Sequence, residues 1–163
     1  MNLIVNVDKN WAIGNNGELL VTLKGDMQYF KQMTTGKVII LGRETLKTFP
    51  LGEPLKDRIN IVMTTDKIFT TENAIIVHST KALLEELKKY KPEDVFVAGG
   101  GSIYKQLLSY VDKAYITKCD KAYPADTFFP NLDLLPEWKL VETSEAYQEN
   151  DVTYSFNLYI RTE

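Results

Sequence analysis

The sequence predicts a single α/β domain, with a mixed and mostly parallel sheet of about eight strands and helices on both of its faces. Two observations predict this class. The first part of the chain alternates short runs of aliphatic, often β-branched residues with segments of helical periodicity. In the last part, residues 138–146 and 152–160 alternate apolar and polar side chains around a polar turn, which is typical of a closing antiparallel hairpin.

The first elements are a strand, a polar loop and a helix. Residues 2–7 are rich in β-branched side chains and predict a buried central strand. Residues 11–18 are rich in glycine and asparagine, so we expect a loop that either bends closely over a ligand or is a plain surface turn. A helix follows from Gly25.

Asp26 interrupts the apolar face of this helix. Met27, Phe30 and Met33 recur at helical spacing, and Asp26 lies at the edge of the stripe that they form. One interpretation is an ordinary first-turn acid that complements the helix dipole. The other is a lone acid in an apolar cleft that holds a cationic or hydrogen-bond-donating ligand. Since the dipole lowers and burial raises the pKa of such a carboxyl group, the pattern leaves both interpretations open.

Two junctions of strand, glycine and helix follow. Residues 37–41 run into Gly42, Arg43 and a short helical pattern, and residues 93–98 run into three glycines and a helix over 102–108. This geometry aims free backbone N–H groups at an anion, and a guanidinium beside it could pair with a phosphate. The Gly-x-Gly-x-x-Gly spacing of the common dinucleotide fingerprint is missing, and such turns also occur without a ligand.

The remaining elements have clear periodicity. A proline-punctuated loop over 50–58 precedes strands at 59–63 and 74–77, a helix capped by Thr80 runs to Lys88, and a strand covers 113–119. Because the early strands alternate with helices, we expect them to pair in parallel.

The composition is that of an ordinary globular domain spanning residues 1–163. Hydrophobic residues make up 44% and charged residues 25% of the chain, a balance that supports a buried core. The net charge is −3 with both signs interspersed. We therefore expect no nucleic-acid partner and no acidic-membrane surface, because either would need a basic excess.

The cysteine and histidine contents argue against disulfides and metal sites. Cys119 is the only cysteine and His78 the only histidine, too few for an internal disulfide or a zinc cluster. The first residues lack the basic start and long apolar run of a signal peptide or a membrane span. We therefore expect a cytoplasmic protein that holds no metal and contacts no membrane.

Five segments, in this order, resemble dihydrofolate reductase of the bacterial chromosomal type. They are Leu3-Ile4-Val5 with Ile13-Gly14, Asp26-Met27-Gln28-Tyr29-Phe30-Lys31, Ile40-Leu41-Gly42-Arg43-Glu44-Thr45, Ala98-Gly99-Gly100-Gly101-Ser102-Ile103-Tyr104 and Asp126-Thr127-Phe128-Phe129-Pro130. Each segment alone is modest support, but together they span essentially the whole chain. The resemblance favours the second interpretation of Asp26.

The resemblance implies a reaction in which NADPH delivers hydride to C6 of dihydrofolate while a proton reaches the adjacent N5, giving tetrahydrofolate. Asp26 would be the catalytic residue and the only ionisable group in the pterin pocket, where it hydrogen-bonds N3 and the 2-amino group of the ring. Such charge-assisted contacts are worth about 1.5–3 kcal/mol each. The proton itself would arrive through water.

The resemblance also places the other substrate contacts. Thr117 would hydrogen-bond Asp26 and the amino side of the pterin, and the carbonyl groups of Ile4 and Ala98 would face the same edge of the ring. Arg58 would bind the α-carboxylate of the glutamate tail. The apolar slot around the pterin and benzoyl rings would be formed by Val5, Met27, Phe30, Phe49 and Leu55.

The implied NADPH contacts come from both glycine junctions, from the first strand and from the segment 13–20, a mobile flap in the family. They are Asn6, Ile13, Gly14, Leu19, Gly42, Arg43, Glu44, Thr45, Thr64, Thr65, His78, Ala98, Gly99, Gly100, Gly101, Ser102, Ile103 and Tyr104. Arg43 with the Thr64-Thr65 turn would bind the 2′-phosphate, which favours NADPH over NADH, and His78 would lie at the rim of that pocket. The family joins the first two of its three glycines by a cis peptide bond.

Two positions depart from the family pattern. Leu20-Val21 stand where many members have Pro-Trp, so the indole that helps order water near the pterin is missing. Ser102 stands where some relatives have a second arginine near the 2′-phosphate, so Arg43 would carry more of the cofactor selectivity. From the resemblance we also expect antifolate inhibitors to bind and the chain to be a monomer.

Two other functions stay open at this point. A pyrimidine reductase of riboflavin synthesis would keep the fold and NADPH, but it would not be expected to combine the Asp26 helix with Arg58. A nucleotide-binding module without turnover would use only the glycine turns. Rapid oxidation of NADPH in the presence of dihydrofolate distinguishes the reductase from both.

Overall fold

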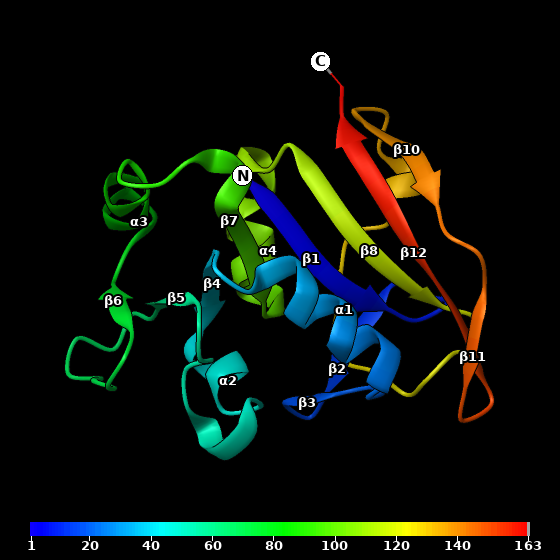
Figure 1. The fold of residues 1–163 in the computed structure, drawn as a ribbon, viewed down its shortest axis with the longest axis horizontal. Helices are drawn as coiled ribbons and strands as arrows, with labels where there is room; N and C mark the ends of the chain where they lie inside the picture. Colours follow the sequence, from blue (N-terminus) through cyan, green and yellow to red (C-terminus); the bar gives the residue numbers. More distant parts are fainter. Residues whose placement is uncertain (163) are drawn as a thin grey trace.

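The structure, a computed structural model, describes residues 1–162. Its main sheet has the strand order β10-β12-β8-β1-β7-β4-β5-β6, with β11 paired to β12 beyond this path (Figure 1). The strands are β1 (Asn2–Val7), β4 (Val38–Gly42), β5 (Ile59–Met63), β6 (Ile75–Val77), β7 (Val95–Gly99), β8 (Lys113–Cys119), β10 (Trp138–Thr143), β11 (Tyr147–Glu149) and β12 (Val152–Arg161). The strands from β8 to β6 pair in parallel, whereas β12 pairs antiparallel with β8, β10 and β11. The predicted mixed sheet with its antiparallel C-terminal hairpin is confirmed.

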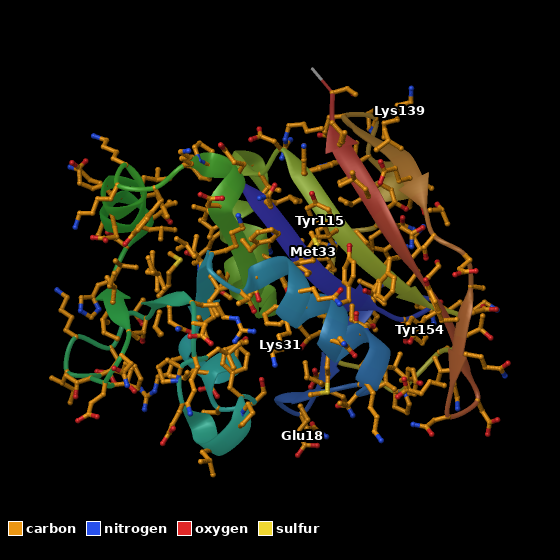
Figure 2. The ribbon with its side chains drawn as sticks, viewed as in Figure 1. Glu18, Lys31, Met33, Tyr115, Lys139 and Tyr154 are labelled. Atoms are coloured by element: carbon orange, nitrogen blue, oxygen red, sulfur yellow. The ribbon has the colours of Figure 1, made fainter. Side chains whose placement is uncertain are left out.

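Helices cover both faces of this sheet, as the sequence predicts. They are α1 (Lys24–Thr34), α2 (Arg43–Leu46), α3 (Thr80–Leu87) and α4 (Gly101–Leu107), with short 3₁₀ turns at Pro50–Gly52, Pro92–Asp94, Leu108–Tyr110 and Leu132–Leu134. Because side chains alternate along a strand, the sheet has two cores. Leu3 of β1 shares one core with Leu83 of α3. The other core lies under α1, where Figure 2 shows Met33 and Tyr115 of β8.

The loop predicted over residues 11–18 contains two short strands instead. β2 (Ala12–Asn15) pairs with β3 (Glu18–Leu19) and with β9 (Thr127–Phe128) in a separate three-stranded sheet. Asp126 adds a further tie, since its carboxylate accepts a hydrogen bond at 3.0 Å from a backbone N–H of the β2–β3 turn. These strands are too short and too polar to show a period of two, so the sequence pattern predicted a loop.

The N-terminal cap of α3 is Ser79 rather than the predicted Thr80. Ser79 has an extended backbone, and its Oγ accepts a hydrogen bond at 3.0 Å from the N–H of Ala82. Both residue types are good caps, so the prediction was wrong by one position because composition alone does not fix where the helical backbone begins.

The start of α1 is set by the C-terminal hairpin. The helix begins at Lys24, one residue before the predicted start, and its N-cap residue, Leu23, is buried and makes no side-chain capping bond. The carboxylate of Glu149, at the end of β11, instead accepts hydrogen bonds from the N–H groups of Lys24 at 2.7 Å and Gly25 at 3.2 Å. A methyl group on Gly25 would overlap the hydroxyl of Tyr154. A side chain at this position would therefore require the Tyr154 side chain of β12 to move.

Glu149→Ala should lower the free energy of unfolding by about 1–2 kcal/mol, because it leaves two N–H groups at the start of α1 without their acceptor. Urea denaturation followed by circular dichroism measures this change. Glu72→Ala, at an exposed turn position, is the matched control and should change stability by less than about 0.5 kcal/mol. Equal effects of the two substitutions would show that Glu149 does not hold the helix.

Candidate functional site

Asp26 lies in the first turn of α1 and faces two paired strands of the sheet. Thr117 of β8 donates its hydroxyl to one carboxylate oxygen (Oγ1 to Oδ1, 2.6 Å), and Asn6 of β1 donates its amide to the other (Nδ2 to Oδ2, 2.9 Å). Asn6 and Thr117 are direct partners in the pairing of β1 with β8. Two cross-strand neighbours therefore hold the carboxyl group in one orientation.

Burial decides the electrostatics of Asp26. It raises the pKa of this carboxyl group, and the hydrogen bonds from Thr117 and Asn6 oppose the rise because they favour the ionised form. The orientation of Asn6 is fixed from behind, since the thiol of Cys119 donates to its Oδ1 at 3.2 Å. Burial raises the pKa of Cys119 to about 12, so the thiol keeps the proton that it donates at neutral pH.

A cavity of about 90 Å³ lies between Asp26 and the flap. Asn6 and Met27 line it from the side of β1 and α1, and Leu20 lines it from the flap. Asp8 also lines the cavity, but both of its carboxylate oxygens accept hydrogen bonds from backbone N–H groups. Asp8 accepts three such bonds, whereas Asp26 accepts only the two from Thr117 and Asn6, so of these two acids Asp26 keeps the greater acceptor capacity.

The predicted apolar slot lies on the α1 side of the sheet. Partly buried side chains pack there against the core that contains Ile4: they are Phe30, Phe49, Leu55 and Ala98. Met27 is 55 % exposed. This face of the sheet thus offers apolar surface next to the Asp26 carboxylate.

The side chain of Val5 does not belong to this slot, so that prediction was wrong. It packs with Leu3 and Val7 in the core on the opposite face of the sheet. Neighbouring side chains along a strand point to opposite faces, and the face of β1 toward Asp26 carries Ile4 and Asn6.

Arg58 is anchored at the C-terminal end of α1. Its Nε donates to Thr34 Oγ1 at 3.1 Å, and its Nη1 donates to the carbonyl of Lys56 at 3.0 Å. Thr34 in turn donates its hydroxyl to the carbonyl of Phe30 at 2.7 Å. The last turn of α1 therefore links Arg58 to the apolar slot. Its Nη2 has no hydrogen-bond partner within residues 1–162 and is available to a carboxylate.

The three glycines of the second junction have reasons within the protein itself. The Gly99–Gly100 peptide bond is cis, as the resemblance implies, and φ of Gly99 is +125°. A methyl group on Gly100 would lie 2.9 Å from Thr45 Oγ1, and one on Gly101 would lie 2.7 Å from Cγ2 of Thr127. The close approach of α2 and β9 explains these glycines, so they do not by themselves establish a bound anion.

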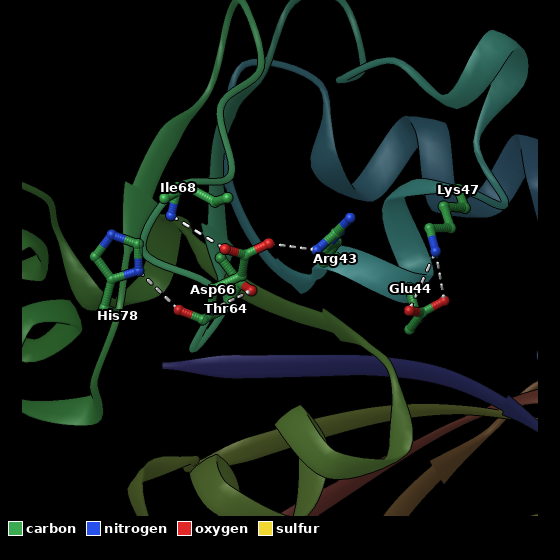
Figure 3. Close-up of polar contacts among 7 residues, drawn as sticks. All are labelled: Arg43, Glu44, Lys47, Thr64, Asp66, Ile68 and His78. Carbon is green, nitrogen blue, oxygen red and sulfur yellow. Dashed lines mark hydrogen bonds and ion pairs between the residues drawn. The ribbon is translucent and has the colours of Figure 1, made fainter.

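Arg43 stands in a polar cluster at the end of β4 (Figure 3). Its Nη1 contacts Asp66 Oδ2 at 2.7 Å, and its guanidinium lies 4.8 Å from the centre of the Phe69 ring. Its Nε is buried and has no partner among the described residues. Thr64 Oγ1 accepts a hydrogen bond from the Asp66 N–H at 3.1 Å, and Nδ1 of His78 lies 2.8 Å from the carbonyl of Thr64. The structure thus brings Arg43, Thr64 and His78 together, as the resemblance implies.

The other predicted cofactor residues differ in where they face. Tyr104 is buried and donates its hydroxyl to the carbonyl of Ile4 at 2.8 Å, which already occupies that carbonyl with one bond. Ser102 accepts a hydrogen bond at 2.9 Å from a side chain one turn along α4, and Glu44 pairs with Lys47 at 3.2 Å on the surface. Ile13, Gly14 and Leu19 lie in the three-stranded sheet of β2, β3 and β9, which we call the flap sheet. Gly42 lies at the first junction, where it faces Ile103 of α4, and Thr65 lies in the turn after β5.

Four features of the site were not predicted. Asp66, Cys119 and Glu149 were not expected to support it, and Asn6 was predicted as a cofactor contact rather than as a donor to Asp26. A signal for Asn6 exists, because it is a polar residue two positions after Ile4 and so shares its face of the strand. Asp66 and Glu149 act across long sequence separations, which local patterns do not report.

Within residues 1–162, His, Cys, Asp and Glu side chains form no group of three that could hold a metal ion. No helix in the described part of the chain is both long and apolar enough to cross a membrane.

Comparisons with known proteins match nearly the whole chain. A family model described as dihydrofolate reductase matches residues 1–161. Dihydrofolate reductase of Staphylococcus haemolyticus is 36% identical over 163 residues, covering 99% of this chain and 95% of the relative. That of Bacillus subtilis is 34% identical over 161 residues, covering 98% and 93%. A solved dihydrofolate reductase from Enterococcus faecalis, complexed with NADP(H) and RAB-propyl, superimposes with a TM-score of 0.87 at 28% identity, covering 99% of this chain and 96% of the other. Since sequence and fold agree from end to end, this chain belongs to the dihydrofolate reductase family, in its bacterial form.

Proposed function

We propose that Asp26 is the residue of this chain that binds and activates the pterin ring of dihydrofolate. As a member of its family, the chain reduces 7,8-dihydrofolate to 5,6,7,8-tetrahydrofolate with NADPH. The observation that carries the assignment is the carboxylate with spare acceptor sites at the flap-covered cavity, oriented by Thr117 and Asn6. A carboxylate has about four acceptor sites, so about two remain for N3–H and the 2-amino group of the pterin.

Asp26 acts through its charge and its fixed orientation. The ionised carboxylate favours a protonated pterin, because an opposite charge stabilises a cation most strongly where water is excluded. Assistance to proton transfer of this kind is worth about 10²–10⁴ in rate. When bound, NADPH supplies the hydride that reduces C6 of the ring. Thr117 and Asn6 keep the carboxylate in place by bonding it from the side of the sheet.

The residues at the ends of β4 and β7 fit the phosphate groups of NADPH. Helices α2 and α4 begin after glycine N-caps that make no side-chain capping bond, so their first N–H groups are open to an anion. Arg43 adds a positive charge and a buried Nε without a partner in the described chain. We propose that Thr45 and the three glycines contact the cofactor and that Arg43 and Thr64 contact its 2′-phosphate.

The glutamate tail of the substrate fits the other end of α1. Arg58 is held through Nε and Nη1, so its free Nη2 can pair with the α-carboxylate in a fixed direction. The apolar side chains of Phe30, Phe49 and Leu55 pack against the same core as Ile4 and suit the benzoyl ring.

The two alternative functions have less support. The family match over residues 1–161 argues against a pyrimidine reductase and against a module without turnover. Mixing the protein with NADPH and dihydrofolate and following nicotinamide absorbance tests all three. Rapid loss of absorbance is the expected result, and a stable signal would contradict the proposed substrate.

We also propose that the chain works as a cytoplasmic monomer and binds antifolates at Asp26. A cytoplasmic location agrees with the sole cysteine, Cys119, which is a buried free thiol. Leu20 and Val21 line the cavity beside Asp26, so the contacts that the flap gives to an antifolate are aliphatic in this chain.

Asp26→Asn should fold and lose about 10²-fold or more of its turnover at neutral pH, because the amide carries no charge to favour a protonated pterin. Activity should recover partly in acid, where the substrate is already protonated. The measurement is kcat against pH, with Asp94→Asn as the control that removes a carboxylate at a surface ion pair. Undiminished turnover of Asp26→Asn at neutral pH would rule out the assigned role.

The raised pKa of Asp26 also makes a prediction about stability. The folded chain holds this proton more tightly than the unfolded chain, so stability falls as pH rises through the ordinary aspartate pKa and levels off above the raised value. Asp26→Asn removes this loss. The variant should therefore unfold at a temperature equal to or above that of the wild type at neutral pH, with its relative advantage shrinking in acid. A variant that is less stable than the wild type only at neutral pH would contradict the direction of the shift.

Arg43→Ala should raise the KM for NADPH by about tenfold or more and change the KM for NADH much less, because the charge-assisted contact to the 2′-phosphate is lost. Steady-state kinetics with each cofactor at saturating dihydrofolate measure both values. Equal changes for the two cofactors would remove the phosphate assignment from Arg43.

A further inference from the structure

The proposed 2′-phosphate pocket contains a negatively charged side chain, Asp66, as well as the positively charged Arg43. Asp66 Oδ2 lies 2.7 Å from Arg43 Nη1, and both side chains are part-exposed, at 36 % for Asp66 and 40 % for Arg43. Figure 3 shows the Asp66 carboxylate pointing at the Arg43 guanidinium from the turn that follows β5. A phosphate that approaches Arg43 therefore meets a nearly neutral pair rather than a free cation.

Asp66 is held in this position by its own turn. Its backbone N–H donates to Thr64 Oγ1 at 3.1 Å, and its Oδ1 accepts a hydrogen bond from the N–H of Ile68 at 3.1 Å. The partner is fixed as well, since the Arg43 guanidinium lies 4.8 Å from the centre of the Phe69 ring. The ion pair is therefore preformed on both sides, and Asp66 cannot leave it without breaking a bond of the turn.

A carboxylate and a guanidinium have opposite effects on the binding of a cofactor when they lie beside the 2′ position of its ribose. In Rossmann-type dinucleotide sites, a carboxylate accepts a hydrogen bond from a free 2′-hydroxyl of the ribose, whereas an arginine accommodates a 2′-phosphate, and the same chemistry applies to any site that contacts this ribose. Asp66 Oδ1 and Oδ2 each accept one hydrogen bond within the protein, and a carboxylate has about four acceptor sites, so about two sites remain. The preference for NADPH over NADH then depends on repulsion of the 2′-phosphate by a carboxylate as well as on its attraction by an arginine.

We propose that Asp66 is a specificity-determining residue of the cofactor site, and this inference rests on the proposed contact between Arg43 and the 2′-phosphate. Asp66 repels the 2′-phosphate of NADPH and competes with it for Arg43. The same carboxylate accepts a hydrogen bond from the 2′-hydroxyl of NADH. The chain therefore discriminates between the two cofactors less than Arg43 alone would allow, and it retains useful affinity for NADH.

The test is Asp66→Asn in the full-length protein. The amide removes the charge and keeps an acceptor for the N–H of Ile68, so the turn is preserved. We expect the Kd for NADPH to fall by about fivefold to tenfold, because like charges at close range cost binding energy. The Kd for NADH should stay the same or rise. Fluorescence titration of each cofactor in the absence of dihydrofolate measures both constants without relying on turnover.

The matched control is Asp94→Asn. Asp94 forms an ion pair with Lys37 at 2.9 Å, with side-chain exposures of 35 % and 40 % that nearly equal those of Asp66 and Arg43. That pair lies at the beginning of β4 and β7, whereas Arg43 follows the end of β4. Asp94→Asn changes the net charge by the same amount and should leave the ratio of the two dissociation constants unchanged. Asp66→Ser, which also keeps an acceptor for the turn, should act in the same direction as Asp66→Asn.

The outcomes separate this inference from the proposed function. If Asp66→Asn and Asp66→Ser leave the ratio of the NADH and NADPH constants unchanged, or weaken NADPH binding, Asp66 does not oppose the phosphate and the inference is overturned. If Arg43→Ala still weakens NADPH selectively in that case, the phosphate contact of Arg43 stands alone. If Arg43→Ala has no selective effect either, both assignments are wrong.

Discussion

The site depends on one carboxylate that is held from two neighbouring strands. Asp26 accepts hydrogen bonds from Thr117 and Asn6, and these residues are direct partners across β1 and β8 in the interior of the sheet. Rigid elements position functional groups more accurately than loops do. The central location of β1 therefore serves the site directly, because it brings an amide and a hydroxyl to the same carboxylate.

This arrangement has a thermodynamic cost that the fold offsets elsewhere. Burial raises the pKa of Asp26, which means that its ionised form is disfavoured in the folded chain. Functional sites commonly give up stability in this way. The Glu149 carboxylate supports the same helix turn by accepting two backbone hydrogen bonds at its start. The C-terminal hairpin thus stabilises the first turn of α1, which carries Asp26.

Much of the fold could be predicted from the sequence because it is written in local periodicity. The continuous apolar runs of β1, β4 and β7 and the helical spacing in α1 fix the element types, and the order of these elements predicts parallel pairing. The hydrogen bond between Asp26 and Thr117 is present where the family resemblance implies it. The face of Val5 was also within reach, since a period of two separates it from Ile4 and Asn6.

The remaining features depend on contacts between distant segments. The flap sheet joins β2 to β9, and its strands are too short for a pattern. Glu149 caps a helix that begins 125 residues earlier in the chain. Asp66 pairs with Arg43 because the two residues follow the ends of the neighbouring strands β5 and β4. The packing partners of the glycines at 99–101, Thr45 and Thr127, were likewise not predicted, because they come from α2 and β9. Only the assembled sheet places these groups together.

The most direct test of this account is the pKa of the Asp26 carboxyl group itself in the ligand-free protein. A ¹³C NMR titration of the carboxyl carbons, assigned by comparison with Asp26→Asn, reports it without any substrate or cofactor. We expect a value above the ordinary aspartate value of about 3.9, because burial outweighs the two hydrogen bonds. A value at or below the ordinary one would mean that burial does not outweigh the hydrogen bonds from Thr117 and Asn6, and the central claim that burial decides the electrostatics of this acid would be wrong.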